Sequence, residues 1–259
     1  MNAIFVGGML ITFILSVGDL TTQIKLPILL DTKMSYTPFV FAALPYFLAS
    51  FGFHTSVPSL VKFYGKNPNV IRDCLFYGTL ISLVIYALWM MVVQGNISRA
   101  DMRPVIDNGG NIGDMVGALT NVGTSSSLAG FINAFANLAV VSSFLGAAIG
   151  LFDYMADKFK LGDSGMGRLK TALICFVPPT IGGVFFPNGF HYAIGLVGLC
   201  GIVVATLIPA LCVRASRKKH GSPLFRVRGG DKMVIFILGY SVVLFVCYFL
   251  SIAGVLPVY

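Results

Sequence analysis

Long uncharged stretches alternate with short charged ones along the chain, and this pattern constrains the fold more than any other feature. A helix needs about 20 mostly apolar residues to cross the hydrocarbon core of a bilayer. Only 11% of the residues are charged, against roughly 25% in a soluble domain. We therefore expect an all-α integral membrane protein, a single transmembrane domain over residues 1–259. Its seven expected spans are residues 1–18, 34–61, 74–98, 115–152, two helices within 171–213, and 233–259.

Two of these runs hold more than one simple span. The run at 171–213 has about twice the required length, and FPNGF at 186–190 predicts a tight hairpin inside it, because Pro and Gly interrupt helices. The run at 115–152 is also too long for one span, so part of it is loop. The outer loop from 94 to 125 contains apolar residues at helical spacing, which predict a short helix over the outer mouth: Ile112, Met115, Val116 and Leu119.

The positive charges lie mostly on one side of the membrane if the seven spans alternate. Fourteen of the 18 Lys and Arg residues follow the second, fourth and sixth spans, and half of these belong to loop 214–232, which begins RASRKKHGSPLFRVRGG. Cytoplasmic loops carry an excess of Lys and Arg. We therefore expect a cytoplasmic N-terminus and a C-terminus on the outer side. The basic loop then faces anionic lipid headgroups, and we expect no nucleic-acid partner.

The stretch SFGFHTSVP at 50–58 contains residues that a plain membrane anchor does not need. Gly52 tolerates unusual φ and ψ, and Pro58, like Pro45 before it, lacks an N–H and clashes with the preceding turn. These residues favour a helix broken near the middle of the membrane, where its backbone is buried in protein or faces a water-filled cavity. Transporters use such freed backbone groups to bind substrates. The alternative is a proline kink without a ligand.

His54 is the only ionisable side chain in this span. Ionisable groups inside a membrane are functional hypotheses by default, and a pKa near neutrality would suit proton coupling. The alternative is a neutral histidine that hydrogen-bonds to a neighbouring helix.

The fourth span carries polar side chains on an otherwise apolar helix, among them Asn137, Ser142 and Ser143. The two serines either line a cavity or take part in helix packing. A stripe of small residues on the same helix favours close packing: Ala139, Ser143, Gly146 and Gly150.

Nothing in the sequence indicates an enzyme. GxSxG, HExxH and Walker A motifs are absent, and the three histidines lie far apart. The five cysteines lack metal-ligand spacing and are expected to be buried free thiols. We expect no catalytic residues, no metal and no cofactor.

Four sets of segments together resemble the bacterial aromatic amino acid permeases. They are LPYFLASFGFHTSVPSLVKFYGKNP at 44–68, VVSSFLGAAIGLFDYMADKF at 140–159, GRLKTAL, VPP and FPNGFHYAIG within 167–195, and the basic segment at 214–230. The tryptophan-specific group is more similar than the tyrosine permease, and the similarity runs along essentially the whole chain. The resemblance implies an amino acid–polyamine–organocation fold in the bacterial inner membrane. In that fold two inverted five-helix repeats hold the substrate between broken first and sixth helices, and coupling is by proton symport.

The resemblance also implies that the chain is the C-terminal portion of such a permease. The family has eleven spans, and this sequence begins where the fifth begins, so its seven spans correspond to helices five to eleven. Two residues depart from the family pattern: Thr55 replaces a glycine, and Met9 stands where the family has a lysine. Related carriers use a lysine of the fifth helix in proton coupling, so the change at Met9 puts coupling in doubt.

The resemblance implies partners and a site. Tryptophan is the expected substrate, with tyrosine as the alternative, and protons, membrane lipids and a missing N-terminal half are the other expected partners. Phe51 and Phe53 would stack on an indole ring. The second hypothesis is a non-transporting fragment of such a permease. The expected substrate-binding residues are Ser50, Phe51, Gly52, Phe53 and His54 on the broken helix, with Asn137, Ser142, Ser143 and Phe144 facing them from the eighth family helix.

Overall fold

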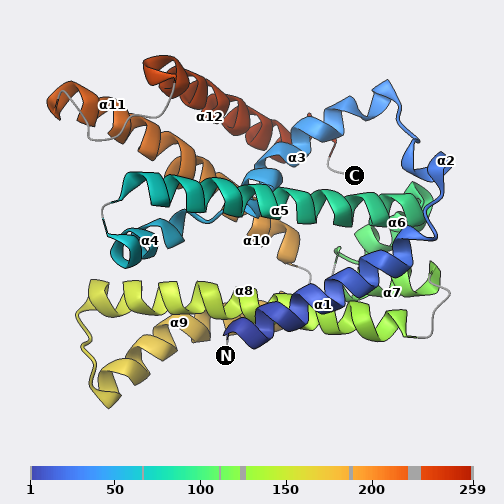
Figure 1. The fold of residues 1–259 in the computed structure, drawn as a ribbon, viewed down its shortest axis with the longest axis horizontal. Helices are drawn as coiled ribbons and strands as arrows, with labels where there is room; N and C mark the ends of the chain where they lie inside the picture. The colour runs from blue at the N-terminus through green and yellow to red at the C-terminus, as the bar shows by residue number, and fades with distance from the viewer. Residues whose placement is uncertain are drawn as a thin grey trace. The chain divides into compact units, whose positions relative to one another are not determined.

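The computed structural model describes residues 2–65, 67–110, 112–122, 127–186, 189–220 and 229–257, and over these ranges the chain is helical without a β-strand (Figure 1). The expected all-α fold is therefore confirmed. The α-helices are α1 (Asn2–Thr21), α2 (Leu26–Leu29), α3 (Thr37–Ser50), α4 (Val57–Tyr64), α5 (Pro68–Asn96), α6 (Arg99–Asp107), α7 (Ile112–Val122), α8 (Leu128–Phe159), α9 (Gly165–Phe185), α10 (Phe190–Gly201), α11 (Ile208–His220) and α12 (Gly230–Ile252). Two 3₁₀ turns, η1 (Met34–Tyr36) and η2 (His54–Ser56), and one π-helical segment, η3 (Ile202–Leu207), complete the order.

Five helical segments of the described residues are long and apolar enough to cross a membrane: Ile4–Thr21, Pro68–Asn96, Leu128–Phe159, Tyr192–Lys219 and Gly230–Ile252. The second expected span is absent from this set because it is divided into α3 of 14 residues and α4 of 8 residues. The fifth is also absent from this set: the uncharged part of α9 after Lys170 is shorter than the roughly 20 residues that a span needs. The count of seven spans stays a prediction.

The interruption expected within 171–213 is present, since α9 ends at Phe185 and α10 begins at Phe190. Pro187 and Asn188 of the expected hairpin lie outside the described residues. The same holds for Lys66 and for residues 221–228 of the basic loop.

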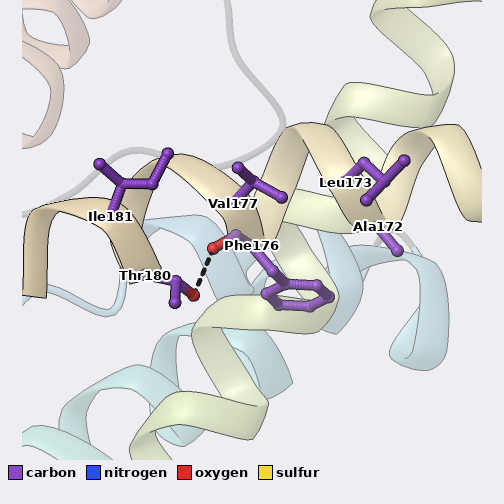
Figure 2. A pocket seen from close by; sticks show the side chains of 6 residues that line it. All are labelled: Ala172, Leu173, Phe176, Val177, Thr180 and Ile181. Atoms are coloured by element: carbon purple, nitrogen blue, oxygen red, sulfur yellow. Dashed lines mark hydrogen bonds between the residues drawn. The ribbon is translucent and has the colours of Figure 1, made fainter. Parts of the chain in front are cut away.

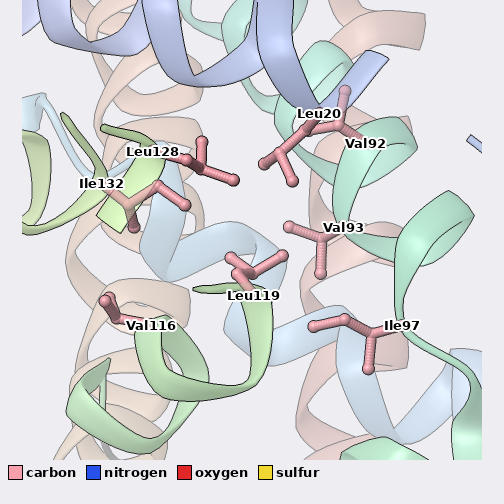
Figure 3. Close-up of a cluster of buried hydrophobic side chains, with 8 residues drawn as sticks. All are labelled: Leu20, Val92, Val93, Ile97, Val116, Leu119, Leu128 and Ile132. Atoms are coloured by element: carbon pink, nitrogen blue, oxygen red, sulfur yellow. The ribbon is translucent and has the colours of Figure 1, made fainter. Parts of the chain in front are cut away.

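The chain divides into two compact units. Unit 1 comprises Met1–Asp31 and Tyr86–His191, and unit 2 comprises Thr32–Ile85 and Tyr192–Tyr259. In unit 1, α1 packs along α8, and a buried cluster joins the ends of four helices (Figure 3). The short helix expected in the outer loop is present as α7, and two of its apolar residues lie in this cluster. The cluster consists of Leu20, Val92, Val93, Ile97, Val116, Leu119, Leu128 and Ile132.

The end of α1 is held against the end of α5 by backbone contacts. The Lys25 N–H donates to the Gly95 carbonyl at 2.9 Å. A Cβ at Gly95 would lie 2.9 Å from Cγ2 of Ile24, so a glycine is needed for this approach. Further along, the Arg99 guanidinium donates to the Asp31 carbonyl at 3.0 Å. These bonds tie the segment after α1 to the start of α6.

Unit 2 is built around α12, which packs against α3, η3 and α11. Ser241 of α12 is fully buried and donates to Oγ1 of Thr206 at 2.8 Å, which joins α12 to the π-helical segment. Arg217 of α11 pairs with Asp231 at the start of α12, with 2.9 Å between the charged atoms.

All five cysteines are free thiols, as expected, but the prediction that all are buried is wrong. Cys175 and Cys247 are buried, whereas Cys200 and Cys212 are exposed on the surface of α10 and α11. An apolar thiol on a helix surface needs no protein contact when that surface faces lipid.

Candidate functional site

The stretch SFGFHTSVP forms the helix break that the sequence predicts. α3 ends at Ser50, Phe51 leaves helical geometry with φ −106° and ψ 24°, and the η2 turn leads into α4. Pro58 lies in the first turn of α4, where its missing N–H costs no hydrogen bond. Pro58 therefore begins a second helix rather than kinking a continuous one. Pro45 remains inside α3.

The amides at the break are largely engaged in local bonds. The N–H groups of Phe51 and Gly52 donate to the carbonyls of Leu48 and Ala49 at 3.2 and 3.1 Å, and the Phe53 N–H donates to the Phe51 carbonyl at 2.9 Å. The next amides along the chain belong to the first residues of η2. The first amides of a helix have no acceptor within that helix, so the start of η2 offers donors to an anionic group.

The backbone at Gly52 does not have the unusual φ that the sequence predicts. Its φ is not positive, in contrast to Gly65 three residues before the start of α5. A Cβ at Gly52 would instead lie 3.0 Å from the Ala49 carbonyl oxygen. A side chain at this position would therefore press on the backbone of the preceding turn, which would have to shift slightly to admit it.

His54 is half-buried, and its Nδ1 atom is buried without a hydrogen-bond partner among the described residues. The alternative, a histidine that hydrogen-bonds through Nδ1 to a neighbouring helix, is therefore not seen among the described residues. Phe53 beside it is 41% exposed, so its ring is available for contact. An unpaired imidazole nitrogen and an open aromatic ring lie next to each other in the sequence at the break.

The four expected residues of α8 do not share one face. Asn137 and Phe144 are seven residues apart, close to two full turns, and both are exposed. Phe144 packs against Phe176 of α9, with 6.0 Å between ring centroids. Ser142 is rotated about 140° from Asn137 at 3.6 residues per turn, and its hydroxyl donates to the Ala139 carbonyl at 3.0 Å. Ser143 is exposed.

Ser142 faces α1. Its Oγ lies 3.9 Å from the Met9 sulfur, the residue that stands where the resemblance expects a lysine. One turn of α8 earlier, Cδ1 of Leu138 would lie 3.4 Å from a Cβ added at Gly8. The position of Met9 is therefore adjacent to an expected site residue, and a thioether there can neither carry charge nor donate a hydrogen bond.

The small-residue stripe of α8 does not have the close helix contact that its pattern favours. Gly146 and Gly150 have no atom of the described chain within 4 Å of an added Cβ. Within the described part of unit 1 these two glycines make no close helix contact, so close packing at this face stays a prediction.

Two grooves lie within unit 1. One has a volume of about 310 Å³ and is lined by α9 residues alone (Figure 2). Its polar side chain, Thr180, uses its hydroxyl on the Phe176 carbonyl at 2.7 Å. The ammonium and carboxylate of an amino acid would find no partner there. The second groove, about 630 Å³, lies between α6 and α7 and includes Asp101 and Asp114. Asp101 already bonds Ser98 at the start of α6.

The nine expected residues divide between the units: five belong to unit 2 and four to unit 1. Sequence reasoning missed three glycines of α10 that face α3, namely Gly195, Gly198 and Gly201. Their spacing of three residues was the available signal, because it places them along one side of a helix.

Comparison with known proteins identifies the family. Residues 1–248 match the tryptophan/tyrosine permease family. A tryptophan-specific transport protein of Shigella flexneri is 48% identical over 262 residues, covering 100% of this chain and 63% of the relative. The corresponding Haemophilus influenzae protein is 40% identical, covering 93% of this chain and 59% of the relative. A tyrosine permease of Enterobacter agglomerans is 43% identical, covering 75% of this chain and 47% of the relative. No solved structure matches the chain.

The chain spans just under two thirds of the length of the curated relatives that it matches. For the Shigella flexneri protein the share is 63%. Permeases are transporters rather than enzymes, and several apolar helices of spanning length characterise a multi-pass protein of the inner membrane. By its match over residues 1–248, the chain belongs to the tryptophan/tyrosine permease family.

Proposed function

We propose that this chain forms the C-terminal part of a carrier that moves tryptophan across the bacterial inner membrane. The observation that carries the proposal is the break between α3 and η2 in a member of the tryptophan/tyrosine permease family. Relatives that match the chain along its length are named for tryptophan, which favours tryptophan over tyrosine as the substrate.

The break offers partners for each part of the substrate. The first amides of η2, which leads directly into α4, have no acceptor within the turn itself, and such helix-start amides suit a carboxylate. The end of α3 presents carbonyl groups and the negative end of a dipole, which suits an ammonium. Phe51 and Phe53 supply rings for an indole. We propose that Ser50, Gly52 and His54 complete this half. From α8 we propose Asn137 and Phe144, which lie about two turns apart on one side of the helix, as further substrate contacts, whereas Ser142 faces α1.

We propose further that the chain crosses the membrane seven times as helices five to eleven of an inverted-repeat carrier. The N-terminus is then cytoplasmic and the C-terminus periplasmic. The divided element α3–η2–α4 counts as one span because discontinuous helices are typical of carrier sites. A preceding group of helices would complete the carrier, and the open face at Gly146 and Gly150 is suited to accept a closely packed helix.

Proton symport is part of the proposal, with His54 as the ionisable side chain at the break. The buried, unpartnered Nδ1 of His54 supports this role. Met9 weakens it, because a methionine cannot take the part of a coupling lysine. The second candidate function is a non-transporting fragment, and the 63% coverage of the Shigella flexneri relative favours it.

The test restores the helices that precede the matched region by fusing them from the Shigella flexneri relative to residue 1. The fusion should take up labelled tryptophan in cells that lack aromatic amino acid carriers. Gly52→Leu should abolish uptake while leaving membrane insertion intact, because the added side chain meets the Ala49 carbonyl and fills the break. Gly78→Leu in α5 is the matched control, since no atom lies within 4 Å of an added Cβ there. Full uptake by a well-expressed Gly52→Leu fusion would remove the break from the site.

A further inference from the structure

The backbones of α3 and α10 touch at one point in unit 2. A Cβ built on Gly198 of α10 would lie 2.9 Å from the carbonyl oxygen of Pro45 and 3.3 Å from its carbonyl carbon. Both atoms belong to the backbone, so a flexible side chain cannot move aside to make room. Pro45 is fully buried at this crossing.

The two neighbouring glycines of α10 have more room. At Gly195 the nearest atom to an added Cβ is the Tyr46 hydroxyl oxygen, at 3.4 Å. At Gly201 it is Cδ2 of Leu48, at 3.8 Å, an ordinary van der Waals distance. The three glycines therefore form a graded series along one face of α10, and only Gly198 excludes a methyl group outright.

The crossing lies one short stretch of helix before the break. Pro45 and Ser50 are five residues apart, about 7.5 Å along α3 at 1.5 Å per residue. α3 stays helical from Pro45 to its last residue, Ser50, and the Ser50 hydroxyl donates to the Tyr46 carbonyl at 3.1 Å within that last turn. A displacement of α3 at Pro45 is therefore carried to Phe51 and Gly52.

We propose that Gly198 is a positioning residue for the substrate site. Its contact with the Pro45 carbonyl sets where the end of α3, and with it the segment from Phe51 to Phe53, lies in unit 2. This inference rests on the proposed function, since it concerns the placement of the same break. Gly198 itself touches no substrate.

For Gly198→Ala, helix propensity and the contact with Pro45 predict opposite effects. Alanine is favoured over glycine in a helix interior by about 1 kcal/mol, so Gly198→Ala should strengthen α10 when considered alone. A methyl group at 2.9 Å from a backbone oxygen must nevertheless push the two helices apart. A shift of about 1 Å at a binding site can change rates on the order of a hundredfold.

The experiment has a proximity arm and a transport arm. The proximity arm uses residues 1–259 with the five native cysteines replaced by alanine, and places cysteines at Leu48 and Gly201, because Cδ2 of Leu48 lies 3.8 Å from a Cβ built on Gly201. Gly198→Ala should slow cross-linking of this pair by a short bifunctional thiol reagent severalfold. Gly239→Ala on α12 of the same unit, with no atom within 4 Å of an added Cβ, should leave it unchanged.

The transport arm measures tryptophan uptake in the fusion described above. Gly198→Ala should raise KM on the order of tenfold with little change in maximal rate or membrane amount, and Gly239→Ala should leave both parameters unchanged. Cross-linking unaffected by Gly198→Ala would overturn the proposed crossing. Slower cross-linking with an unchanged KM would overturn the positioning role. A parent fusion without uptake would contradict the proposed function. In that case the positioning role is tested by the rate at which a cysteine placed at Phe53 reacts with a thiol reagent. A rate changed by Gly198→Ala would support the role, and an unchanged rate would refute it.

Discussion

Asn96 joins the ends of two helices of unit 1 from a buried position, with 3% of its surface exposed. Its Nδ2 group donates to the Leu20 carbonyl of α1 at 2.9 Å and to the Val92 carbonyl of its own helix at 2.7 Å. Its Oδ1 atom is buried without a partner among the described residues. The amide therefore stabilises unit 1 through its two donors alone.

Asn96→Asp keeps the shape of the side chain and removes both donors. A carboxylate oxygen would then face two carbonyl oxygens. An interhelical hydrogen bond in a membrane protein contributes about 0.6 kcal/mol and up to about 1.7, and an unsatisfied buried acceptor costs about 1–3 kcal/mol. We expect Asn96→Asp to lower the free energy of unfolding of unit 1 by about 3 kcal/mol.

Asn96→Leu should change much less. It also loses both donors, but it removes the unpartnered Oδ1 at the same time. The Leu20 carbonyl keeps a donor, because the Gln23 N–H lies 3.2 Å from it. The variant therefore leaves no unsatisfied acceptor on the side chain and loses only the two hydrogen bonds, so we expect a loss of about 1 kcal/mol.

Trp89 makes the assay specific for unit 1, since it is the only tryptophan in the chain. Its ring lies 5.5 Å from Phe135 and 6.3 Å from Phe13, in contact with both α8 and α1. Unfolding of residues 1–259 by SDS in mixed micelles is followed by Trp89 fluorescence. Asn133→Asp is the matched control, because Asn133 is exposed and makes one bond within its own helix. Equal unfolding midpoints for Asn96→Asp and Asn133→Asp would refute the reasoning.

Three further predictions test other parts of the molecule. In a cysteine-free background, a cysteine at Thr32 should react with a membrane-impermeant reagent added to intact cells and one at Lys218 should not, and the reverse pattern would invert the proposed topology. In cells lacking aromatic amino acid carriers, residues 1–259 alone should give no more uptake of labelled tryptophan than an empty vector, because the break lacks the partner helices that an inverted-repeat carrier needs. Saturable, uncoupler-sensitive uptake would contradict this. Gly95→Ala should destabilise unit 1 by about 1–3 kcal/mol through overpacking against Ile24, and Ile24→Ala should restore part of the loss in the same fluorescence assay.

The helical, membrane-spanning class of this protein follows from its sequence because length and charge alone decide whether a segment can remain in hydrocarbon. The break at SFGFHTSVP was equally readable, since Pro58 and Gly52 act on the backbone within one turn. The helix at residues 112–122 followed from the spacing of Val116 and Leu119. Each of these features depends on neighbours along the chain.

Other features depend on which helices meet, and the sequence did not predict them. Pro45 remains inside α3, where it packs fully buried against α10. Ser142 faces Met9 while Asn137 and Phe144 point elsewhere, since α1 lies along one side of α8. The close approach of Gly198 to Pro45 joins residues 153 positions apart in the sequence. A glycine in an apolar helix has the same local pattern whether it faces lipid, as an open surface, or another backbone, and only the packing of the helices distinguishes the two.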